Sequence, residues 1–292
     1  MKVSLLGTGR IGFPMAQRLL QAGHKVTVYN RTRSKAEPLK DSGARVVTGI
    51  DEAVAKAQCV IMMLSDAKAI REVLMVQPPL EFQRCVVIQM GTIYPLESKE
   101  FLEYIVQRGG EYFECPVLGS KAEAKEGRLI LMVGSTKEQF VQWKDFLKCL
   151  GPQPRWVGEV GKAAVLKLAF NQLIASLATA FSISLAAIRR YGIDAETFMT
   201  ILRESVLYAP MFDKKLPGML KREFTNPNFS LKLLLKDVDL FLKWGKNQGL
   251  PLVHLEGVRM ILQRALDAGL ADEDYTALYN IVDPVNEKGG PS

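Results

Sequence analysis

The apolar residues of the first 160 positions gather in short runs that alternate with amphipathic stretches. Four runs rich in Val and Ile are typical of buried strands, at 2–6, 25–29, 59–64 and 85–90. Helical spacing is found between and after them, at 11–22, 34–42, 50–56, 67–74 and 95–108. Two more apolar segments, 112–114 and 129–133, would complete the same sheet. Strands and helices in alternation predict a parallel sheet wrapped by helices on both faces.

The pattern changes near residue 160. Residues 161–191 place apolar side chains at helical spacing for about eight turns. Further helical segments follow without any strand pattern, at 195–205, 210–220, 231–248, 253–268 and 275–280. We therefore predict two domains, an α/β domain at 1–160 and an all-α domain at 161–292 built on a long central helix. That helix would span about 45 Å, more than a small domain needs, so we expect it to serve the interface of a homodimer or homotetramer.

One stretch of this helix, 168–188, has no charged residue and is long enough to cross a bilayer. Polar residues interrupt it at six positions: Asn171, Gln172, Ser176, Thr179, Ser182 and Ser184. We therefore interpret it as a helix buried between domains or subunits, and favour no membrane association.

Composition narrows the class of protein. Hydrophobic residues make up 48% and charged residues 24% of the 292 positions, which is typical of a soluble globular protein. The net charge of +7 comes without a basic run, so a small anionic ligand is favoured over nucleic acid. The four cysteines lack the paired spacing of a metal site or a disulfide framework. Because the start of the chain resembles a strand and not a signal peptide, we expect a cytoplasmic protein in a reducing compartment.

The first predicted strand leads directly into the glycine-rich segment Gly7-Thr8-Gly9-Arg10-Ile11-Gly12, and a helix follows. Gly7 permits a tight turn, Gly9 lets the backbone approach a pyrophosphate, and Gly12 lets the helix pack closely on the strand. The N-terminus of that helix then faces the phosphates. A structural turn is the alternative, but this position between strand and helix predicts dinucleotide binding.

The end of the second strand indicates which nicotinamide dinucleotide is bound. An acidic residue there would accept hydrogen bonds from the ribose of NAD, but this chain has Asn30, Arg31 and Thr32, with Lys35 close behind. Arg31 is suited to a forked pair with the 2′-phosphate of NADP, and Asn30 and Thr32 add donors. A solvated basic loop is the alternative. We predict NADP(H) as the preferred cofactor, with NAD(H) possible.

Neither histidine suits proton transfer, since His24 falls in a turn before the second strand and His254 in a late helix. Lys167 instead lies near the start of the long apolar helix, with Asn171 on the same face four residues later. Burial lowers the pKa of a lysine toward the range useful for proton transfer. A lysine whose amine reaches solvent along an apolar surface is equally compatible with this pattern, so the residues alone leave both readings open.

Motifs spread over nearly the whole chain resemble the β-hydroxyacid dehydrogenase family. They are Gly7 to Gly12, Asn30-Arg31-Thr32, Met63-Leu64-Ser65-Asp66, Met90-Gly91-Thr92, the segment 116–121 continuing to 126–129, the segment 161–167 ending at Asn171, and 229–237. Within the family, the strand-end residues and the loop Gly119-Ser120-Lys121 look most similar to the glyoxylate and succinic semialdehyde reductase branch, whose members favour NADPH. The resemblance implies a Rossmann-type doubly wound sheet domain followed by an all-α domain.

The resemblance also implies residue roles. Lys167 would be the general acid that protonates the carbonyl oxygen, and Asn171 would orient the substrate. Cofactor contacts would come from Gly7, Thr8, Gly9, Arg10, Ile11, Gly12, Asn30, Arg31, Thr32, Lys35, Leu64, Ser65, Thr92 and Lys236. Substrate contacts, for a small carboxylate-bearing molecule, would come from Thr92, Gly119, Ser120, Lys121, Asn171, Phe229 and Asp237.

The chain departs from the family pattern at three positions. Leu118 stands where the family usually has serine, which removes a hydroxyl donor and about 1–3 kcal/mol of carboxylate binding unless Ser120 or Lys121 compensates. Gly91 also replaces a common serine, and Glu114 replaces the more frequent aspartate, a change we regard as minor.

Three other functions compete with an NADPH-dependent aldehyde-acid reductase. An NAD-dependent 3-hydroxyisobutyrate-type dehydrogenase is the nearest of them. Imine reductases and non-catalytic dinucleotide-binding proteins share the same scaffold, but they usually lack the lysine that this chain has at Lys167.

Overall fold

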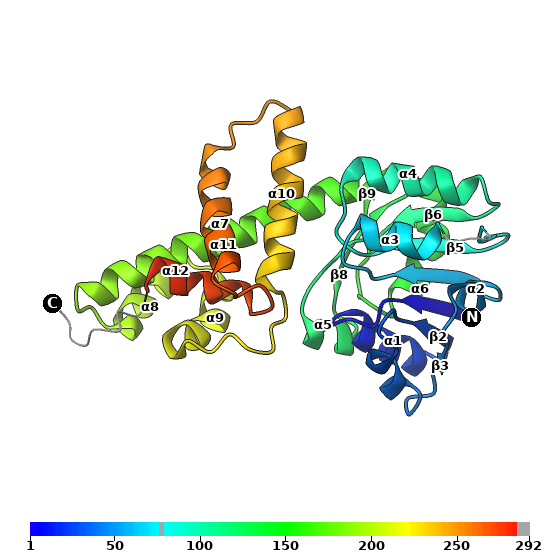
Figure 1. The fold of residues 1–292 in the computed structure, drawn as a ribbon, viewed down its shortest axis with the longest axis horizontal. Helices are drawn as coiled ribbons and strands as arrows, with labels where there is room; N and C mark the ends of the chain where they lie inside the picture. The colour runs from blue at the N-terminus through cyan, green and yellow to red at the C-terminus, as the bar shows by residue number, and fades with distance from the viewer. Residues whose placement is uncertain (76–78, 285–292) are drawn as a thin grey trace. The chain divides into compact units, whose positions relative to one another are not determined.

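The structure is a computed structural model, and it describes residues 1–75 and 79–284. The chain forms two compact units, Met1–Leu168 and Ala169–Ser292, and each is described by itself below. The division between them falls within the longest helix, α7 (Lys162–Arg190). Figure 1 shows both units, with many of their helices and strands labelled.

The first unit is built on one sheet with the strand order β3-β2-β1-β4-β5-β6-β8-β7, and β9 pairs with β8. Its strands are β1 (Lys2–Leu6), β2 (Lys25–Tyr29), β3 (Arg45–Val46), β4 (Cys59–Met62), β5 (Val86–Gln89), β6 (Glu111–Glu114), β7 (Val117–Leu118), β8 (Ile130–Gly134) and β9 (Arg155–Gly158). Strands β1 to β6 are parallel, as the alternating pattern predicts.

The alternating pattern predicts a parallel sheet, but β8 runs antiparallel to β6. The cause lies in the connection between them. After β6 the chain forms β7, turns back through the short helix α5 (Lys121–Glu126), and then pairs β8 against β7 in antiparallel register, with Val117 opposite Leu131.

Helices cover both faces of this sheet, as predicted. The chain provides α1 (Gly12–Gln21), α2 (Ile50–Val54), α3 (Ala67–Leu74), α4 (Pro95–Val106) and α6 (Lys137–Leu147). Alternate strand residues enter two separate cores. Cys59 and Ile61 of β4 pack in the core that contains α1 and α6, whereas Val60 and Met62 pack in the core that contains α2, α3 and α4. Strands buried on both faces read as continuous apolar runs, which explains why the sequence revealed them.

The helix expected at 34–42 was wrong. The chain forms two single 3-10 turns there, η1 (Arg33–Lys35) and η2 (Glu37–Leu39). Pro38 explains the difference, because proline supplies no backbone N–H and disfavours helical backbone in the residue before it.

The second unit is helical, as predicted. Its part of α7 is followed by α8 (Ala195–Glu204), α9 (Pro210–Lys221), α10 (Leu231–Asn247), α11 (Val253–Asp267), η3 (Tyr275–Leu278) and α12 (Tyr279–Val282). Among its described residues the β-type pairing is a single bridge, between Ser230 and Asp274.

Within the described part of the chain, α7 is the one helix long and apolar enough to cross a membrane by length and composition. Core helices of soluble proteins meet the same description. One face of α7 is buried, and it includes polar side chains at Asn171, Thr179 and Ser182.

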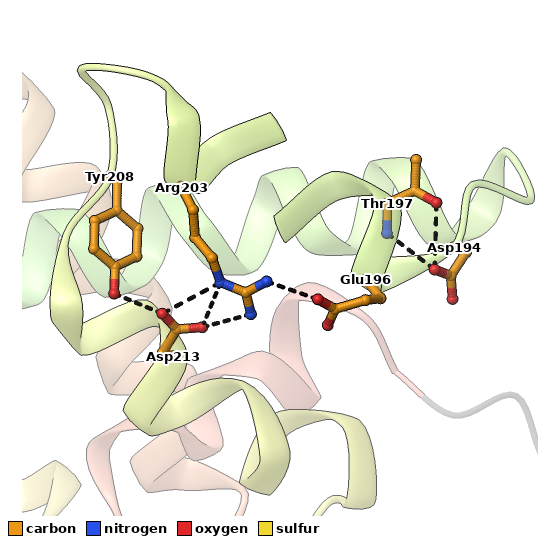
Figure 2. A network of polar contacts seen from close by, with 6 residues as sticks. All are labelled: Asp194, Glu196, Thr197, Arg203, Tyr208 and Asp213. Atoms are coloured by element: carbon orange, nitrogen blue, oxygen red, sulfur yellow. Dashed lines mark hydrogen bonds and ion pairs between the residues drawn. The ribbon is translucent and has the colours of Figure 1, made fainter. Parts of the chain in front are cut away.

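An exposed polar network ties α8 to α9 in the second unit (Figure 2). The Arg203 guanidinium donates to Asp213 at 2.8 Å and to Glu196 at 2.7 Å. The Tyr208 hydroxyl donates to the same Asp213 at 2.5 Å. Asp194 caps α8 by accepting from the backbone N–H of Thr197 at 3.0 Å.

Candidate functional site

The first unit gathers most of the predicted cofactor residues at one edge of its sheet. The last residues of five parallel strands stand in register, in the order Tyr29, Leu6, Met62, Gln89, Glu114. The predicted residues that follow these strands therefore share that edge: residues 7–12, Asn30, Arg31, Thr32, Leu64, Ser65 and Thr92. Open α/β sheets bind ligands at this carboxyl edge, where the strand order reverses on either side of β1.

The glycine loop has the geometry that a pyrophosphate needs. Gly7 has φ +99°, a conformation that side chains disfavour, and a Cβ at Gly12 would collide with the Gly7 carbonyl oxygen. At Gly9 a Cβ would meet no atom within 4 Å, so this backbone is open to a ligand. The hydroxyl of Thr8 is buried without a hydrogen-bond partner. An open backbone, an unpartnered hydroxyl and the N-terminus of α1 together fit a dinucleotide.

The residues predicted to bind the 2′-phosphate differ in their hydrogen bonds and exposure. The Asn30 side chain holds the loop together, since it accepts from the Thr8 N–H at 3.0 Å and donates to the Thr32 carbonyl at 2.8 Å. Arg31 is 83% exposed and pairs with Glu72 at 3.2 Å. Exposed pairs of this kind contribute little, so an anion of higher charge would compete well for Arg31.

Three of the predicted contacts follow β4 and β5: Leu64, Ser65 and Thr92. Ser65 donates to Asp66 at 2.9 Å, and Asp66 caps α3. Gly91, next to Thr92, lies so close to the neighbouring strand end that a Cβ would stand 2.5 Å from the Leu64 carbonyl oxygen. This backbone therefore has no room for the serine that the family commonly places there.

The predicted substrate loop forms the turn into α5. Gly119 is exposed with φ +147°, and Lys121, half-buried, is the first residue of α5. Ser120 caps that helix, and its hydroxyl donates to the Glu123 carboxylate. Because its one proton is used in this way, Ser120 would have to rotate before it could replace the hydroxyl that Leu118 lacks.

Lys167 lies in the second turn of α7, and only 9% of it is exposed. Lysine is seldom buried to this extent. The first turn of the same helix is fixed by Glu114, a residue that sequence reasoning treated as a minor substitution. Its carboxylate accepts from the backbone N–H of Gly161 at 2.8 Å and of Ala164 at 3.0 Å.

In the second unit the predicted residues Asn171, Lys236 and Asp237 form one cluster, in which Asn171 and Asp237 are buried and Lys236 is half-buried. The Asn171 amide donates to one Asp237 oxygen at 2.6 Å, and the Lys236 ammonium lies 2.8 Å from the other. Since Asp237 only accepts, the NH₂ of Asn171 must face it, which leaves the Asn171 carbonyl oxygen buried without a partner. Phe229 is half-buried, and its ring packs edge-on against Tyr275.

Comparison with known proteins decides the family. Residues 2–158 match the NAD binding domain of 6-phosphogluconate dehydrogenase, and residues 161–282 match the NAD-binding domain of NADP-dependent 3-hydroxyisobutyrate dehydrogenase. Glyoxylate/succinic semialdehyde reductase 1 of Arabidopsis thaliana is 33% identical over 97% of this chain and 98% of its own length. This chain belongs to the β-hydroxyacid dehydrogenase family.

A further relative agrees with this assignment, and a solved structure agrees with the fold. The chloroplastic glyoxylate/succinic semialdehyde reductase 2 of Arabidopsis thaliana is 29% identical over 94% of this chain and 78% of its own length. The structure of 3-hydroxyisobutyrate dehydrogenase from Mycobacterium tuberculosis superposes with a TM-score of 0.85 at 22% identity, over 96% of this chain and 98% of the other. That structure supports the fold. The chain is an NAD(P)-dependent oxidoreductase acting on hydroxyl groups.

The predicted residues of this β-hydroxyacid dehydrogenase fall into two groups, one in each unit. The first unit holds the glycine loop, the strand-end residues, the substrate loop and Lys167; the second holds Asn171, Phe229, Lys236 and Asp237. Their individual roles stay predictions. Chemically, the first group provides a dinucleotide cradle and a buried amine, and the second provides a buried amide held by a carboxylate.

Proposed function

We propose that this β-hydroxyacid dehydrogenase reduces a small aldehyde acid of the glyoxylate or succinic semialdehyde type with NADPH, and that Lys167 donates the proton. The observation that supports this most is the burial of Lys167, 9% exposed in a helix whose first turn is fixed by hydrogen bonds. The names of both plant relatives point to the same substrates.

When bound, the reduced nicotinamide would supply a hydride to the carbonyl carbon. Negative charge then develops on the carbonyl oxygen, and the Lys167 ammonium stabilises that charge and donates the proton that completes the alcohol. Asn171 orients the substrate, and the carboxylate of Asp237 keeps its amide in one rotamer. Gly119 offers backbone N–H to the substrate carboxylate.

The proposed preference for NADPH rests on the end of β2. No carboxylate stands at Asn30, Arg31 or Thr32, and Arg31 is exposed with a partner that a phosphate could displace. A substitution of Arg31→Glu would place a negative charge against the 2′-phosphate and should reverse the preference toward NADH.

NAD-dependent oxidation of 3-hydroxyisobutyrate is the second candidate. The name of the family that matches residues 161–282 favours its substrate, although that name describes an NADP-dependent enzyme. Steady-state kinetics with glyoxylate, succinic semialdehyde and 3-hydroxyisobutyrate, each with both cofactors, separates the two. We expect kcat/KM to be highest for an aldehyde acid with NADPH. A maximum for 3-hydroxyisobutyrate with NAD would replace our proposal with the second candidate, and cofactor binding without any turnover would indicate a non-catalytic protein.

We also propose that α7 joins two copies of the chain. Leu173, Leu177 and Ile183 of this helix are 48%, 37% and 50% exposed. Large apolar side chains exposed together are typical of subunit interfaces. Sedimentation of the double variant Leu173→Lys, Ile183→Lys should give a smaller species than the wild type; an unchanged oligomer would exclude these side chains from the interface.

A further inference from the structure

Glu114 is a buried carboxylate that the proposed chemistry leaves unused. It ends β6, it is 1% exposed, and burial raises the pKa of its carboxyl group. Burying a charged carboxylate costs free energy unless hydrogen bonds replace its lost hydration. Its partners therefore indicate what it does.

The hydrogen bonds described here are all donated to Glu114. One oxygen, Oε1, accepts from the Gly161 and Ala164 N–H groups, and the backbone of Ala163 also lowers the pKa by hydrogen bonding. The other, Oε2, accepts from the Ser98 hydroxyl at 2.5 Å. With Ser98 donating, all of these contacts are donated to the carboxylate, and the arrangement fits the ionised form.

The hydroxyl of Tyr112 completes this arrangement. It lies 2.9 Å from Ser98 Oγ, and since Ser98 gives its one proton to Glu114, Tyr112 must donate to Ser98. Tyr112 and Ser98 are as buried as Glu114. The carboxylate is thus held by α4 and β6 on one side, and it holds the start of α7 on the other.

The first turn of α7 depends on this carboxylate. The initial N–H groups of a helix have no partner within the helix, and negative charge at this end is stabilising. Lys167 follows Ala164 by three residues and Ala163 by four, so it projects from the same side of the helix one turn later. A shift of the first turn would move the Lys167 amine with it.

The side chain of Glu114 is longer than that of the aspartate more frequent in the family, and Gly134 provides the space for it. A Cβ at this glycine would lie 2.5 Å from Glu114 Oε1 and 2.7 Å from its Cγ. The strand that follows Glu114 also leads into the substrate loop, through β7 to Gly119. Glu114 therefore joins the base of that loop to the start of the helix that bears the amine.

We propose that Glu114 is a positioning residue, whose buried carboxylate fixes the first turn of α7 and thereby sets the place of the Lys167 amine for proton transfer. This inference rests on the proposed function of Lys167. Displacing a catalytic group by about 1 Å costs on the order of a hundredfold in rate, so loss of the carboxylate should lower kcat far more than it changes cofactor affinity.

The test compares Glu114→Gln with Glu111→Gln, an exposed glutamate on the same strand, and with the core variant Leu147→Ala as a control for general destabilisation. Four quantities are measured on the full chain: kcat and KM with NADPH and glyoxylate or succinic semialdehyde, the solvent deuterium isotope effect on kcat, the Kd for NADPH, and amide hydrogen exchange at Gly161 and Ala164.

We expect Glu114→Gln to lose about a hundredfold in kcat, with KM and the Kd for NADPH changed by less than about threefold. The solvent isotope effect should rise, because a misplaced amine makes proton transfer rate-limiting, and both amides should exchange faster. Glu114→Asp keeps the charge and should recover part of kcat. A loss of kcat no larger than that of Leu147→Ala, with unchanged exchange, would overturn the proposal.

Two arrangements keep the test decisive. If Glu114→Gln does not fold, Ser98→Ala removes one hydrogen bond and keeps the charge; faster exchange with lower kcat supports the inference, and wild-type values for both overturn it. If the wild type reduces no aldehyde acid, the proposed function fails. Amide exchange in Glu114→Gln then still decides whether the carboxylate holds the helix.

Discussion

Two polar networks of this molecule use similar hydrogen bonds in opposite surroundings. The network of Glu114, Ser98 and Tyr112 lies inside the first unit, with each residue at most 1% exposed. The network of Arg203 with Asp213 and Glu196 lies on the surface of the second unit, where the side chains are 38%, 36% and 67% exposed (Figure 2).

The difference shows that hydrogen-bond geometry alone does not determine how much a network contributes to the stability of the fold. Water replaces the partners of a broken surface pair, so such pairs contribute about 0–1 kcal/mol. A buried donor or acceptor that loses its partner has no such replacement. The charge of Glu114 is also disfavoured by burial, and the pKa of its carboxyl group is raised, whereas Arg203 and Tyr208 lower the pKa of Asp213 by hydrogen bonding.

The largest expected effect on stability is that of Glu114→Ala. The substitution leaves the N–H groups of Gly161 and Ala164 and the Ser98 hydroxyl without their acceptor. A buried donor left without its acceptor costs about 1–3 kcal/mol, so we expect the free energy of unfolding to fall by at least about that amount, measured by urea denaturation. Glu111→Ala on the same strand is the control. Equal losses in the two variants would show that burial makes no difference here.

The next effect concerns pH and has opposite signs in the two networks. Because the folded-state pKa of Glu114 is raised above 4.5, this group favours the folded state most below pH 4.5, and its contribution falls as pH rises through the folded pKa. Because the pKa of Asp213 is lowered below 3.8, its contribution is present above pH 3.8 and is lost as pH falls through the folded pKa.

Unfolding measured from pH 3 to pH 7 should reveal both signs. The stability difference between wild type and Glu114→Gln should shrink as pH rises above 4.5, while that between wild type and Asp213→Asn should shrink as pH falls below 3.8. Tyr112 stays protonated over this range, because burial raises the pKa of its hydroxyl. Parallel curves for wild type and Glu114→Gln would contradict the raised pKa.

The smallest effect is expected for Arg203→Ala. Its exposed pairs with Asp213 and Glu196 should be worth about 0.2–1 kcal/mol in total, and salt should reduce even this. Thermal denaturation at low and high ionic strength measures it. A loss of more than about 2 kcal/mol, unchanged by salt, would show that the surface network stabilises the second unit as strongly as a buried one.

The sequence revealed those parts of the fold whose signal is local. Strands β1, β2, β4 and β5 lie in apolar runs, and the glycine loop lies between a strand and a helix. Helix α6 was missed because its residues are mostly polar, although Thr136 and Gln139 form a capping box that marks its start. The short strands β3, β7 and β9 were missed because their pairing depends on neighbours distant in the chain.

The role of Glu114 could not be predicted for the same reason. Its partners lie 16 residues before it and 47 to 50 residues after it, and only the folded sheet brings them together. Lys167 could be singled out, since a lysine in an apolar helix is unusual in any sequence. The substitution of glycine at Gly91 likewise gained its explanation only from the closeness of the Leu64 carbonyl.

The most direct test of the central claim is single-turnover reduction of glyoxylate or succinic semialdehyde by NADPH in Lys167→Met, followed by NADPH absorbance. Lys162→Met, at an exposed lysine on the same helix, is the matched control. We predict that Lys167→Met binds NADPH normally but transfers hydride at least about a hundredfold more slowly, whereas Lys162→Met behaves as wild type. Hydride transfer at the wild-type rate in Lys167→Met would contradict the account.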